Sequence, residues 1–334
     1  MKEYLNLVKN VAENGTYKPN RTGVDTISSF SYSYKIDLSD GFPLLTTKQM
    51  SEYRWNSMIY ELFWYLSGES HIRNLREHTS IWDAWADEDG GLDTSYARFW
   101  RQYPMPKEQH KETHNGEVWA DDETIDSESF LNEDGTFDQV EYILHCLENK
   151  PETRRMVLTA WHPGNASVST LPPCHFTSVF NIQGNTLNTH LTQRSGDIAL
   201  GIPFNIASYS LLTHLIAEEA GFEVGEFSHQ IVDSHIYCGS GERGKWYDDN
   251  LSTFQDRLQN DGPIAAREYI EENAPDETTE NEDHIPNLMT QLTREPLSRP
   301  NINISDTSLE NLTAEDVELE EYDSHSPLNF SVAE

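Results

Sequence analysis

The sequence has few basic residues: 23 Lys and Arg stand against 57 Asp and Glu among 334 residues, a formal net charge of −34. Nucleic-acid binding requires clustered Lys and Arg that neutralise phosphates, so this deficit excludes nucleic acid as the main ligand. Long apolar runs are also lacking, because no stretch approaches the roughly 20 residues that span a bilayer. The start of the chain, MKEYLNLVKN, contains no apolar signal segment. We therefore expect a soluble, cytoplasmic protein that does not bind membranes.

Cysteine is scarce, with Cys146, Cys174 and Cys238 widely spaced along the chain. An odd number at such spacing argues against a disulfide framework and against a zinc knuckle. The sequence also lacks a glycine-rich phosphate loop and a dinucleotide-binding fingerprint. If a nucleotide binds, side chains must therefore hold its phosphate.

Apolar residues make up 36% of the chain, enough for a substantial core, and the length fits two ordinary domains or one large α/β domain. Acidic residues concentrate at 104–140, 258–288 and 305–323, where apolar periodicity is weak. We interpret the first two regions as surface insertions, at about 104–136 and 258–288. They either bind a partner or solvate a protein that works in high salt. We favour the second reading, because high charge supports solubility without specifying a fold.

Apolar spacing predicts amphipathic helices at 53–66 and 137–149, and a strongly apolar helix at 205–220. Glu61 lies on the apolar stripe of the first helix, where a carboxylate either reaches solvent or is held in a polar cleft and moves protons. The residues before the third helix, 201–204, are interpreted as a loop placed to hold a ligand.

Runs of strand-forming residues occupy 157–161, 176–182 and 186–194, and the last two predict a hairpin around Gly184. In the second hairpin strand, alternate residues form one apolar face and one polar face. The polar face, which includes Arg194, is either exposed or lines a pocket.

Cys174 follows Pro172 and Pro173 at the start of a predicted strand, where the two prolines restrict the backbone. As a lone cysteine it is either inert or a nucleophile. Neighbouring residues of a strand point to opposite faces, so His175 is poorly placed to form the Cys–His pair of a hydrolase. If Cys174 reacts, nearby cations must activate it, and Arg194 is the obvious candidate.

Eight motifs occur in the order found in the folate-dependent thymidylate synthases, which the chain resembles from about Tyr4 onward, apart from the two acidic segments. The motifs are TTK (46–48), ELFW (61–64), IWDAWA (81–86), RR (154–155), PCH (173–175), QRSGD (193–197), GIPFNIASY (201–209) and DSHIY (233–237). The resemblance implies one α/β domain of the α+β type over residues 1–334, with a large mixed sheet flanked by helices. It also implies a homodimer that packs sheet to sheet.

The resemblance implies the reductive methylation of dUMP to dTMP, with 5,10-methylenetetrahydrofolate as both one-carbon donor and reductant and dihydrofolate as the second product. Cys174 would add to carbon 6 of the pyrimidine, which divides a difficult methylation into feasible steps. Glu61 would organise the water that relays protons, and Tyr96 would lie near the proton that leaves carbon 5. No metal takes part.

The resemblance also implies how the phosphate of dUMP is bound. Arg21, Arg194 and Ser195 would hold it within one subunit, and Arg154 and Arg155 would reach it from the partner subunit. Arginine suits this role because its planar fork makes charge-assisted, bidentate bonds to phosphate.

The remaining nucleotide contacts follow from the same resemblance, which adds Gly196 and Asp197 to the site. Asn205 would pair with the pyrimidine, because an amide both donates and accepts. His235 and Tyr237, on one face of a strand, would contact the ribose hydroxyl. The implied folate contacts are Ser51, Ile81, Trp82, Trp85, Asp197, Leu200, Phe204 and Ala333.

Three positions depart from the family pattern. Ser51 stands where many members have His, and Gly196 stands where Cys is frequent. Glu334 gives the chain a charged end, whereas the family closes its site with a segment that ends in a small apolar residue.

Three alternatives remain at this point. A deoxycytidylate hydroxymethylase would use the same thiol addition without the hydride step, but Asn205 argues against it, since a reader of cytosine is expected to carry Asp. A non-catalytic acidic binding protein on an enzyme scaffold would lack any activity to lose on mutation of Cys174. A cysteine hydrolase is disfavoured by the placement of His175.

Overall fold

The computed structural model describes residues 1–20, 22–92, 96–105, 113–114, 117–118, 130–167 and 169–333. The helices are α1 (Lys2–Asn14), α2 (Glu52–Ser67), α3 (Tyr96–Arg101), α4 (Gln139–Asn149), α5 (Pro163–Ala166), α6 (Gly201–Ala220), α7 (Gly241–Asp261), α8 (Pro263–Asn273) and α9 (Ile285–Leu292). The strands are β1 (Thr16–Lys18), β2 (Val24–Asp37), β3 (Thr113–His114), β4 (Glu117–Val118), β5 (Val157–Thr159), β6 (His175–Gln183), β7 (Thr186–Asp197), β8 (Glu223–Ser240), β9 (Asn301–Ile304) and β10 (Val317–Glu320).

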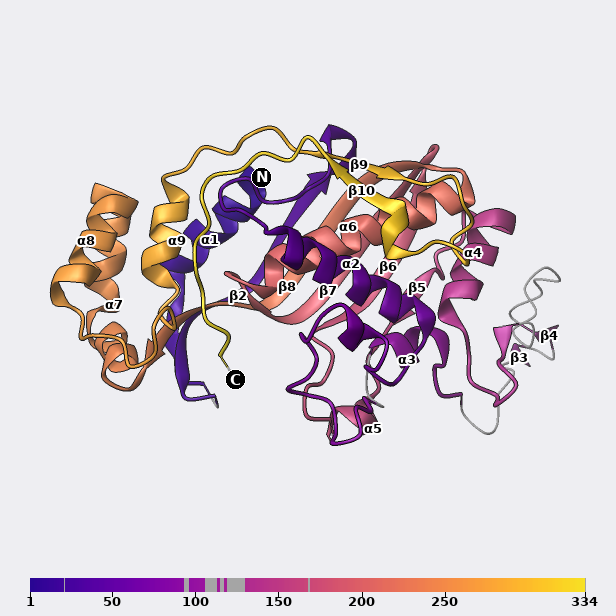
Figure 1. The fold of residues 1–334 in the computed structure, drawn as a ribbon, viewed down its shortest axis with the longest axis horizontal. Coiled ribbons are helices and arrows are strands. Elements are labelled where there is room, and N and C mark those ends of the chain that lie inside the picture. Colours follow the sequence, from indigo (N-terminus) through magenta and orange to yellow (C-terminus); the bar gives the residue numbers. More distant parts are fainter. Residues whose placement is uncertain are drawn as a thin grey trace.

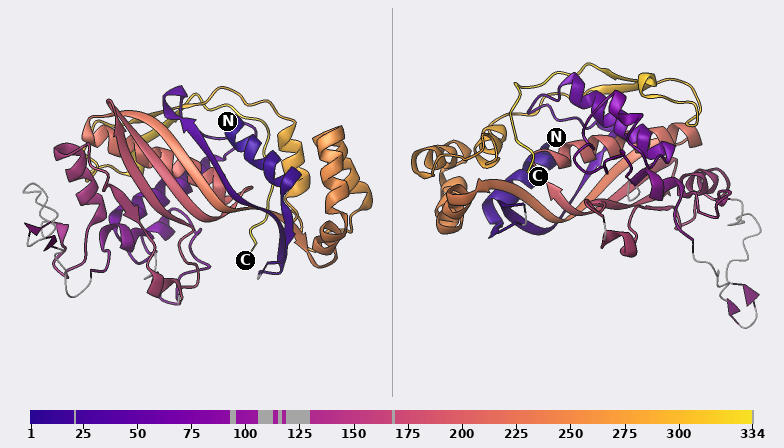
Figure 2. Two further views of the ribbon diagram at one scale, coloured as in Figure 1. Left: turned by 180° about the vertical axis from the view of Figure 1, so that it is seen from behind. Right: turned by 60° about the horizontal axis from the view of Figure 1, so that its bottom comes forward.

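Six of the described strands form one sheet in the order β1-β2-β8-β7-β6-β5. Strands β7 and β8 run parallel and the other neighbours antiparallel, so the sheet is mixed, as the resemblance implied. The parallel pair requires a crossover, which α6 supplies. Figure 1 shows α1, α2 and α6 in front of the sheet, and Figure 2 shows the strands from behind with no helix in front of them.

The predicted helices form where apolar spacing and end signals agree. Helix α2 begins after Ser51, whose Oγ accepts a bond from the Arg54 amide, and ends at Gly68 in the left-handed conformation. Helix α6 likewise ends at Gly221. It begins at Gly201, so residues 201–204 are not the expected loop but the first turn of the helix.

The hairpin of β6 and β7 is confirmed, with Gly184 at positive φ in the turn. Leu187, Thr189 and Leu191 on the apolar face of β7 are all at most 1% exposed. The alternate face, which includes Arg194, is only half-buried. This is the face that Figure 2 shows without a helix over it.

The three acidic regions differ in what the structure shows of them. Most of 104–136 lies outside the described residues. Residues 305–323 include β10, which pairs with β9. Residues 258–288, where we expected an insertion with little helical pattern, instead contain the end of α7, all of α8 and the start of α9, and Leu258 and Ile270 are buried there. Tertiary contacts hold these helices although their apolar periodicity is weak, and the interpretation of 258–288 as an insertion stays a prediction.

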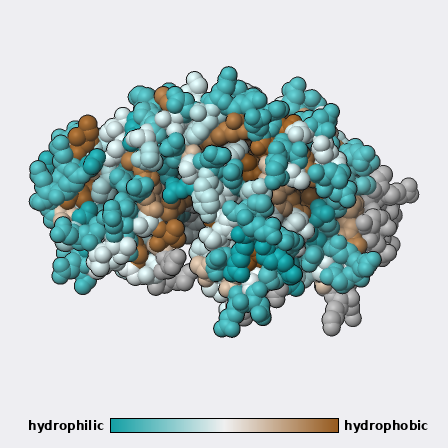
Figure 3. Space-filling view, viewed as in Figure 1, coloured by the Kyte–Doolittle hydropathy of each residue, from teal (hydrophilic) through white to brown (hydrophobic). Residues whose placement is uncertain are grey.

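Helix α7 illustrates such contacts. Gln255 Nε2 donates to the carbonyls of Ala12 (3.3 Å) and Gly15 (2.9 Å), and Gln259 Nε2 donates to that of Glu13 (3.0 Å). These amides satisfy carbonyls at and just beyond the end of α1, which a helix terminus leaves without intrahelical partners. Helices α7 and α8 lie at one end of the molecule (Figure 1), and hydrophilic residues cover most of the face seen in Figure 3. Among the described residues, no helix is long and apolar enough to cross a membrane.

Candidate active site

Cys174 lies directly before β6 and is partly exposed, with its thiol not in a disulfide. Its backbone N–H donates to the hydroxyl of Tyr96 over 2.6 Å, and Nη2 of Arg194 lies 3.3 Å from its sulfur. Arg194 is fixed there, because its Nε donates to the Pro173 carbonyl (2.9 Å) and its Nη2 to the Pro172 carbonyl (2.6 Å). A guanidinium so close to a thiol favours the thiolate, the reactive form. The structure thus brings together the cysteine and the arginine that the sequence singled out.

His175 is not the base of Cys174. Its ring is buried, stacks on Tyr96 with centroids 4.0 Å apart, and places Nδ1 2.7 Å from the Tyr209 hydroxyl. Burial lowers the pKa of His175 to about 3, with a smaller contribution from Arg194, so the ring is neutral near pH 7. The predicted absence of a Cys–His pair is confirmed, and this disfavours a cysteine hydrolase.

Asn205, in the second turn of α6, ends a chain of buried polar groups. Its Oδ1 accepts a bond from Gln193 Nε2 (2.9 Å), and Gln193 Oε1 in turn lies 3.0 Å from His229 Nε2. The other nitrogen of His229 lies 2.7 Å from the Tyr34 hydroxyl. Burial lowers the pKa of His229 to about 3, so the neutral ring donates from Nε2 and accepts at Nδ1. The sequence reasoning quoted Gln193 within a motif but missed its role in orienting Asn205.

His235 and Tyr237 lie two residues apart on β8 with ring centroids 5.2 Å apart. Asp233, on the same strand, pairs with Lys18 and accepts a 2.7 Å bond from Ser28. The neighbouring His235, followed by the bonds from Lys18 and Ser28, holds the pKa of Asp233 far below its usual range. The two residues therefore share one strand, as expected, and their contact with the ribose stays a prediction.

Glu61 extends from α2 and accepts a 2.7 Å bond from the indole N–H of Trp82. Burial raises its pKa to about 7. A carboxyl that titrates near neutrality can both give and take a proton. The bond from Trp82 and the partial burial of Glu61 favour a carboxylate held in a polar cleft over one that simply reaches solvent at the helix edge.

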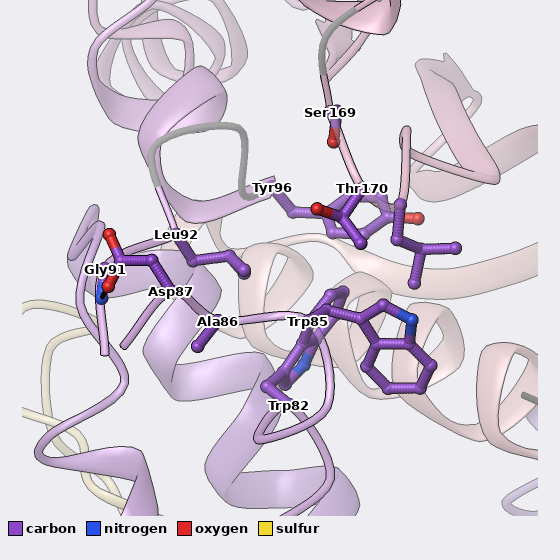
Figure 4. A pocket seen from close by; sticks show the side chains of 10 residues that line it. Trp82, Trp85, Ala86, Asp87, Gly91, Leu92, Tyr96, Ser169 and Thr170 are labelled. Atoms are coloured by element: carbon purple, nitrogen blue, oxygen red, sulfur yellow. Dashed lines mark hydrogen bonds between the residues drawn. The ribbon is translucent and has the colours of Figure 1, made fainter. Parts of the chain in front are cut away.

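A cavity of about 220 Å³ lies beside this group (Figure 4). Trp82 and Trp85 form one side, and Tyr96 and Thr170 face them. Aromatic walls suit a flat heterocycle. The lining residues are Trp82, Trp85, Ala86, Asp87, Gly91, Leu92, Tyr96, Ser169, Thr170 and Leu171.

Other predicted folate residues do not line that cavity. Leu200 and Phe204 line a second, smaller hollow together with Lys48. Ile81 is half-buried against the core. Ser51 is exposed and caps α2, so the structure gives it a local role of its own.

Asp197 ends β7 and accepts a 2.9 Å bond from the Ala199 amide. Ser195 and Gly196 precede it on the same strand. A Cβ added at Gly196 would lie 2.5 Å from Cδ1 of Ile202, so the side chain of Ile202 occupies the space that a larger residue at 196 needs. A larger residue at 196 therefore requires the end of the Ile202 side chain to shift.

Five residues that the sequence analysis singled out are not tested by the geometry of one subunit. Arg21 and Glu334 lie outside the described residues. Arg154 and Arg155 are exposed between α4 and β5. Ala333 is half-buried at the end of the described chain. Within the described ranges, no group of three or more His, Cys, Asp or Glu residues could hold a metal ion.

Comparison with known proteins decides the family. The thymidylate synthase family model matches residues 2–334. The chain belongs to the thymidylate synthase family. It is 55% identical over 336 residues to a thymidylate synthase of Haloferax volcanii, an alignment that covers 99% of this chain and 96% of that protein. Membership makes this chain an enzyme of the methyltransferase type, and the recognition made from the eight motifs is confirmed.

Proposed function

We propose that the protein converts dUMP to dTMP with 5,10-methylenetetrahydrofolate, and that Cys174 is the nucleophile. The supporting observation is the 3.3 Å contact between Arg194 Nη2 and the Cys174 sulfur, in a site bordered by an aromatic cavity. Attack by the thiolate on carbon 6 forms a C–S bond and moves the electron pair of the double bond to carbon 5. Carbon 5 then becomes nucleophilic. The folate supplies the one-carbon unit and the hydride that completes the methyl group.

The protein's own groups would manage the protons of this reaction. Glu61, with its pKa near 7, would relay a proton through water to and from the pyrimidine. The Tyr96 hydroxyl, which accepts from the Cys174 amide, would lie near the proton that leaves carbon 5. The thiolate leaves carbon 6 at the end of the cycle, so Cys174 is regenerated.

Asn205 would read the base and so select uracil over cytosine. Its Oδ1 is engaged by Gln193, which leaves Nδ2 to donate to the O4 carbonyl of uracil. Cytosine presents an amino donor at that position and is disfavoured. This orientation supports a synthase acting on dUMP over the dCMP hydroxymethylase. Gly196, Asp197, His235 and Tyr237 would complete the nucleotide site.

The pterin would lie between the tryptophans and the end of β7. Trp82 and Trp85 offer flat apolar faces, and the carboxylate of Asp197 offers two acceptors for pterin N–H groups. Ile81, Leu200 and Phe204 would add apolar contact, with Ser51 and Ala333 at the edges of the site. The residues present therefore fit a folate.

We also infer that the enzyme is a homodimer packed sheet to sheet. The strands seen from behind in Figure 2 carry Phe30 at 84% exposure and a half-buried polar face on β7. Arg154 and Arg155 of each subunit would contact the phosphate held by Arg21, Arg194 and Ser195 of the other. None of the three cysteines forms a disulfide, which fits work in the reducing cytoplasm.

A mechanism-based ligand tests the proposed reaction. Incubation with 5-fluoro-dUMP and methylenetetrahydrofolate should give a covalent ternary adduct on Cys174, because fluorine cannot leave carbon 5 as a cation. Mass spectrometry of the intact protein and its peptides, in concentrated potassium chloride, would locate the adduct. Cys174→Ala should form none, while Cys146→Ala, at a buried position in α4, should still form it. An active protein that forms no adduct would overturn the assignment.

A further inference from the structure

His284 is a buried histidine just before α9 that the sequence analysis left inside the acidic region 258–288. Its backbone N–H donates to the Tyr237 carbonyl (3.0 Å), so it lies against the end of β8. Its ring packs edge-on between Tyr237, with centroids 5.5 Å apart, and Phe330, with centroids 5.1 Å apart. The residue therefore lies between the nucleotide-contacting strand and the C-terminal segment.

Each ring nitrogen of His284 faces an oxygen that can only accept. Nε2 lies 2.9 Å from the carbonyl of Ser331 in the C-terminal segment. Nδ1 lies 3.7 Å from Oδ1 of Asp197, an ion-pair distance, and has no hydrogen-bond partner among the described residues. A neutral imidazole carries a proton on only one nitrogen, so only the imidazolium serves both neighbours.

The charges around His284 support that state. Burial alone would lower the pKa of His284, but the Asp197 carboxylate and the Ser331 carbonyl raise it above its ordinary value. Asp283, the preceding residue, acts in the same direction. His235 and Lys48 also interact electrostatically with the Asp197 carboxylate, and the Lys48 ammonium lies 4.6 Å from the Phe330 ring centroid.

A buried polar cluster fixes the backbone that carries His284. Arg243 on α7 binds Oδ2 of Asp283 through Nε (2.8 Å) and Nη2 (2.7 Å), and Tyr247 donates to the same oxygen (2.7 Å). The other carboxylate oxygen of Asp283 accepts from the Ile285 amide (3.0 Å). Removing one member of such a buried pair leaves an uncompensated charge, so the cluster is rigid. The acidic segment thereby sets the position of a residue in the site.

The C-terminal segment docks on the same region. The Ser331 amide donates to the Asn281 carbonyl (2.9 Å), and its hydroxyl donates to the Glu280 carbonyl (2.7 Å). Asn287 Nδ2 donates to the Asn329 carbonyl (2.8 Å). His284 is thus one of several groups that hold the segment, and among these it is the one that also faces Asp197.

We propose that His284, as an imidazolium, is a positioning residue that ties the C-terminal segment at Ser331 to the Asp197 carboxylate and so sets the affinity for the folate. Arg243, Tyr247 and Asp283 hold it in place. The effect on folate rests on the proposed contact between Asp197 and the pterin. The tie between His284 and the segment rests on the geometry of the protein alone.

Two amide substitutions separate the two sides of the ring. In His284→Asn the amide nitrogen takes the position of Nδ1, keeps a donor toward Asp197 and loses the bond to Ser331. In His284→Gln the nitrogen takes the position of Nε2, keeps the bond to Ser331 and loses the donor toward Asp197. His325→Asn is the matched control, because His325 makes a similar bond to the Glu295 carbonyl.

The readouts are backbone hydrogen exchange of residues 329–333 and the separate KM values for the folate and dUMP. We expect His284→Asn to speed exchange of the segment and both variants to raise the folate KM by about tenfold, with the KM for dUMP nearly unchanged. A general loss of packing would raise both KM values together. Exchange of the segment in His284→Asn equal to that of wild type and the control would overturn the proposal.

Two further measurements keep the outcomes distinct. In the wild type, hydrogen–deuterium exchange at the C2 position of the histidine rings should show that His284 is protonated at neutral pH. The C-terminal segment should loosen as pH rises through the pKa of His284. A ring that stays neutral from about pH 5 to about pH 9 overturns the tie even if the variants do not fold. Asp197→Asn tests the other link: an unchanged folate KM refutes the pterin contact, while the tie is still judged by exchange of the segment.

Discussion

Gln193 donates to Asn205 through a 2.9 Å hydrogen bond and thereby determines which end of the Asn205 amide is free. Two further hydrogen bonds fix the orientation of Gln193. His229 Nε2 donates to Gln193 Oε1, and His229 Nδ1 accepts from the Tyr34 hydroxyl. In this series of hydrogen bonds, each group has only one arrangement of protons that satisfies its neighbours. If Asn205 reads the base as proposed, strands β7, β8 and β2 set the choice between uracil and cytosine before a ligand binds.

Asn205→Asp should shift preference from dUMP to dCMP. An aspartate still accepts from Gln193 with one oxygen, and its second oxygen would accept from the cytosine amino group. We expect the ratio of kcat/KM for dCMP to that for dUMP to rise on the order of a hundredfold or more. Steady-state assays with both nucleotides measure it, and Asn260→Asp, at the exposed end of α7, controls for added charge. Unchanged discrimination would remove Asn205 from base recognition.

Glu61→Gln should change how stability depends on pH. Burial raises the pKa of Glu61 from 4.5 to about 7, so the folded state holds this proton more tightly than the unfolded chain does. The wild type should therefore lose stability as pH rises through that interval, by at most about 3 kcal/mol. The glutamine variant should lack this component. Denaturant unfolding at several pH values in constant salt measures the difference, and parallel curves would contradict it.

Mixed subunits test the arginines proposed to cross the interface. The double variant Arg154→Ala/Arg155→Ala and the variant Cys174→Ala should each be nearly inactive. If the arginines serve the other subunit, mixing and reassociating the two should restore one complete site in each heterodimer. With random pairing this gives about one quarter of wild-type activity. Arginines that serve their own subunit would leave both sites of the heterodimer incomplete, so the absence of restored activity would contradict the role. Where activity is restored, the adduct with 5-fluoro-dUMP should form on the Arg154→Ala/Arg155→Ala chain, which carries the intact Cys174.

Gly196→Ala should destabilise the protein by about 1–3 kcal/mol, because the new Cβ meets Cδ1 of Ile202. Ile202→Val removes that methyl group and should recover part of the loss. A double-mutant cycle from denaturant midpoints isolates the coupling between the two positions. Additive effects would mean that Ile202 is not what limits the space at 196.

The sequence predicted best where local pattern and tertiary structure agree. Helices at 53–66 and 137–149 and the hairpin around Gly184 were found within a few residues, because their apolar spacing is also their buried face. Sequence motifs located the cysteine, its arginine and the tryptophans, because these residues lie in short segments that match the family's motifs. Their distances from one another came only with the fold.

The misses have a common cause. In α8, charged residues interrupt the apolar spacing that would predict a helix. Helix α7 is held by glutamine side chains that bond to carbonyls at the end of α1, and no residue pattern within α7 predicts those bonds. Treating 258–288 as one acidic unit also concealed Asp283 and His284, which are buried against β8. A buried His beside a buried Asp carries no signal in a single sequence. The role of His284 becomes visible only in the fold, where β7, β8 and the C-terminal segment contact one another around it.

The order of the strands affects how this chain can be made. Strand β2 is complete within the first 37 residues, yet its long partner β8 ends at residue 240. During synthesis β2 therefore waits, with one edge unsatisfied, until most of the polypeptide has left the ribosome. The nascent chain cannot close its central sheet early, and its surplus of like charge would help keep these waiting intermediates apart. The negative charge of the folded protein would thus also reduce aggregation of the chain before its sheet is complete.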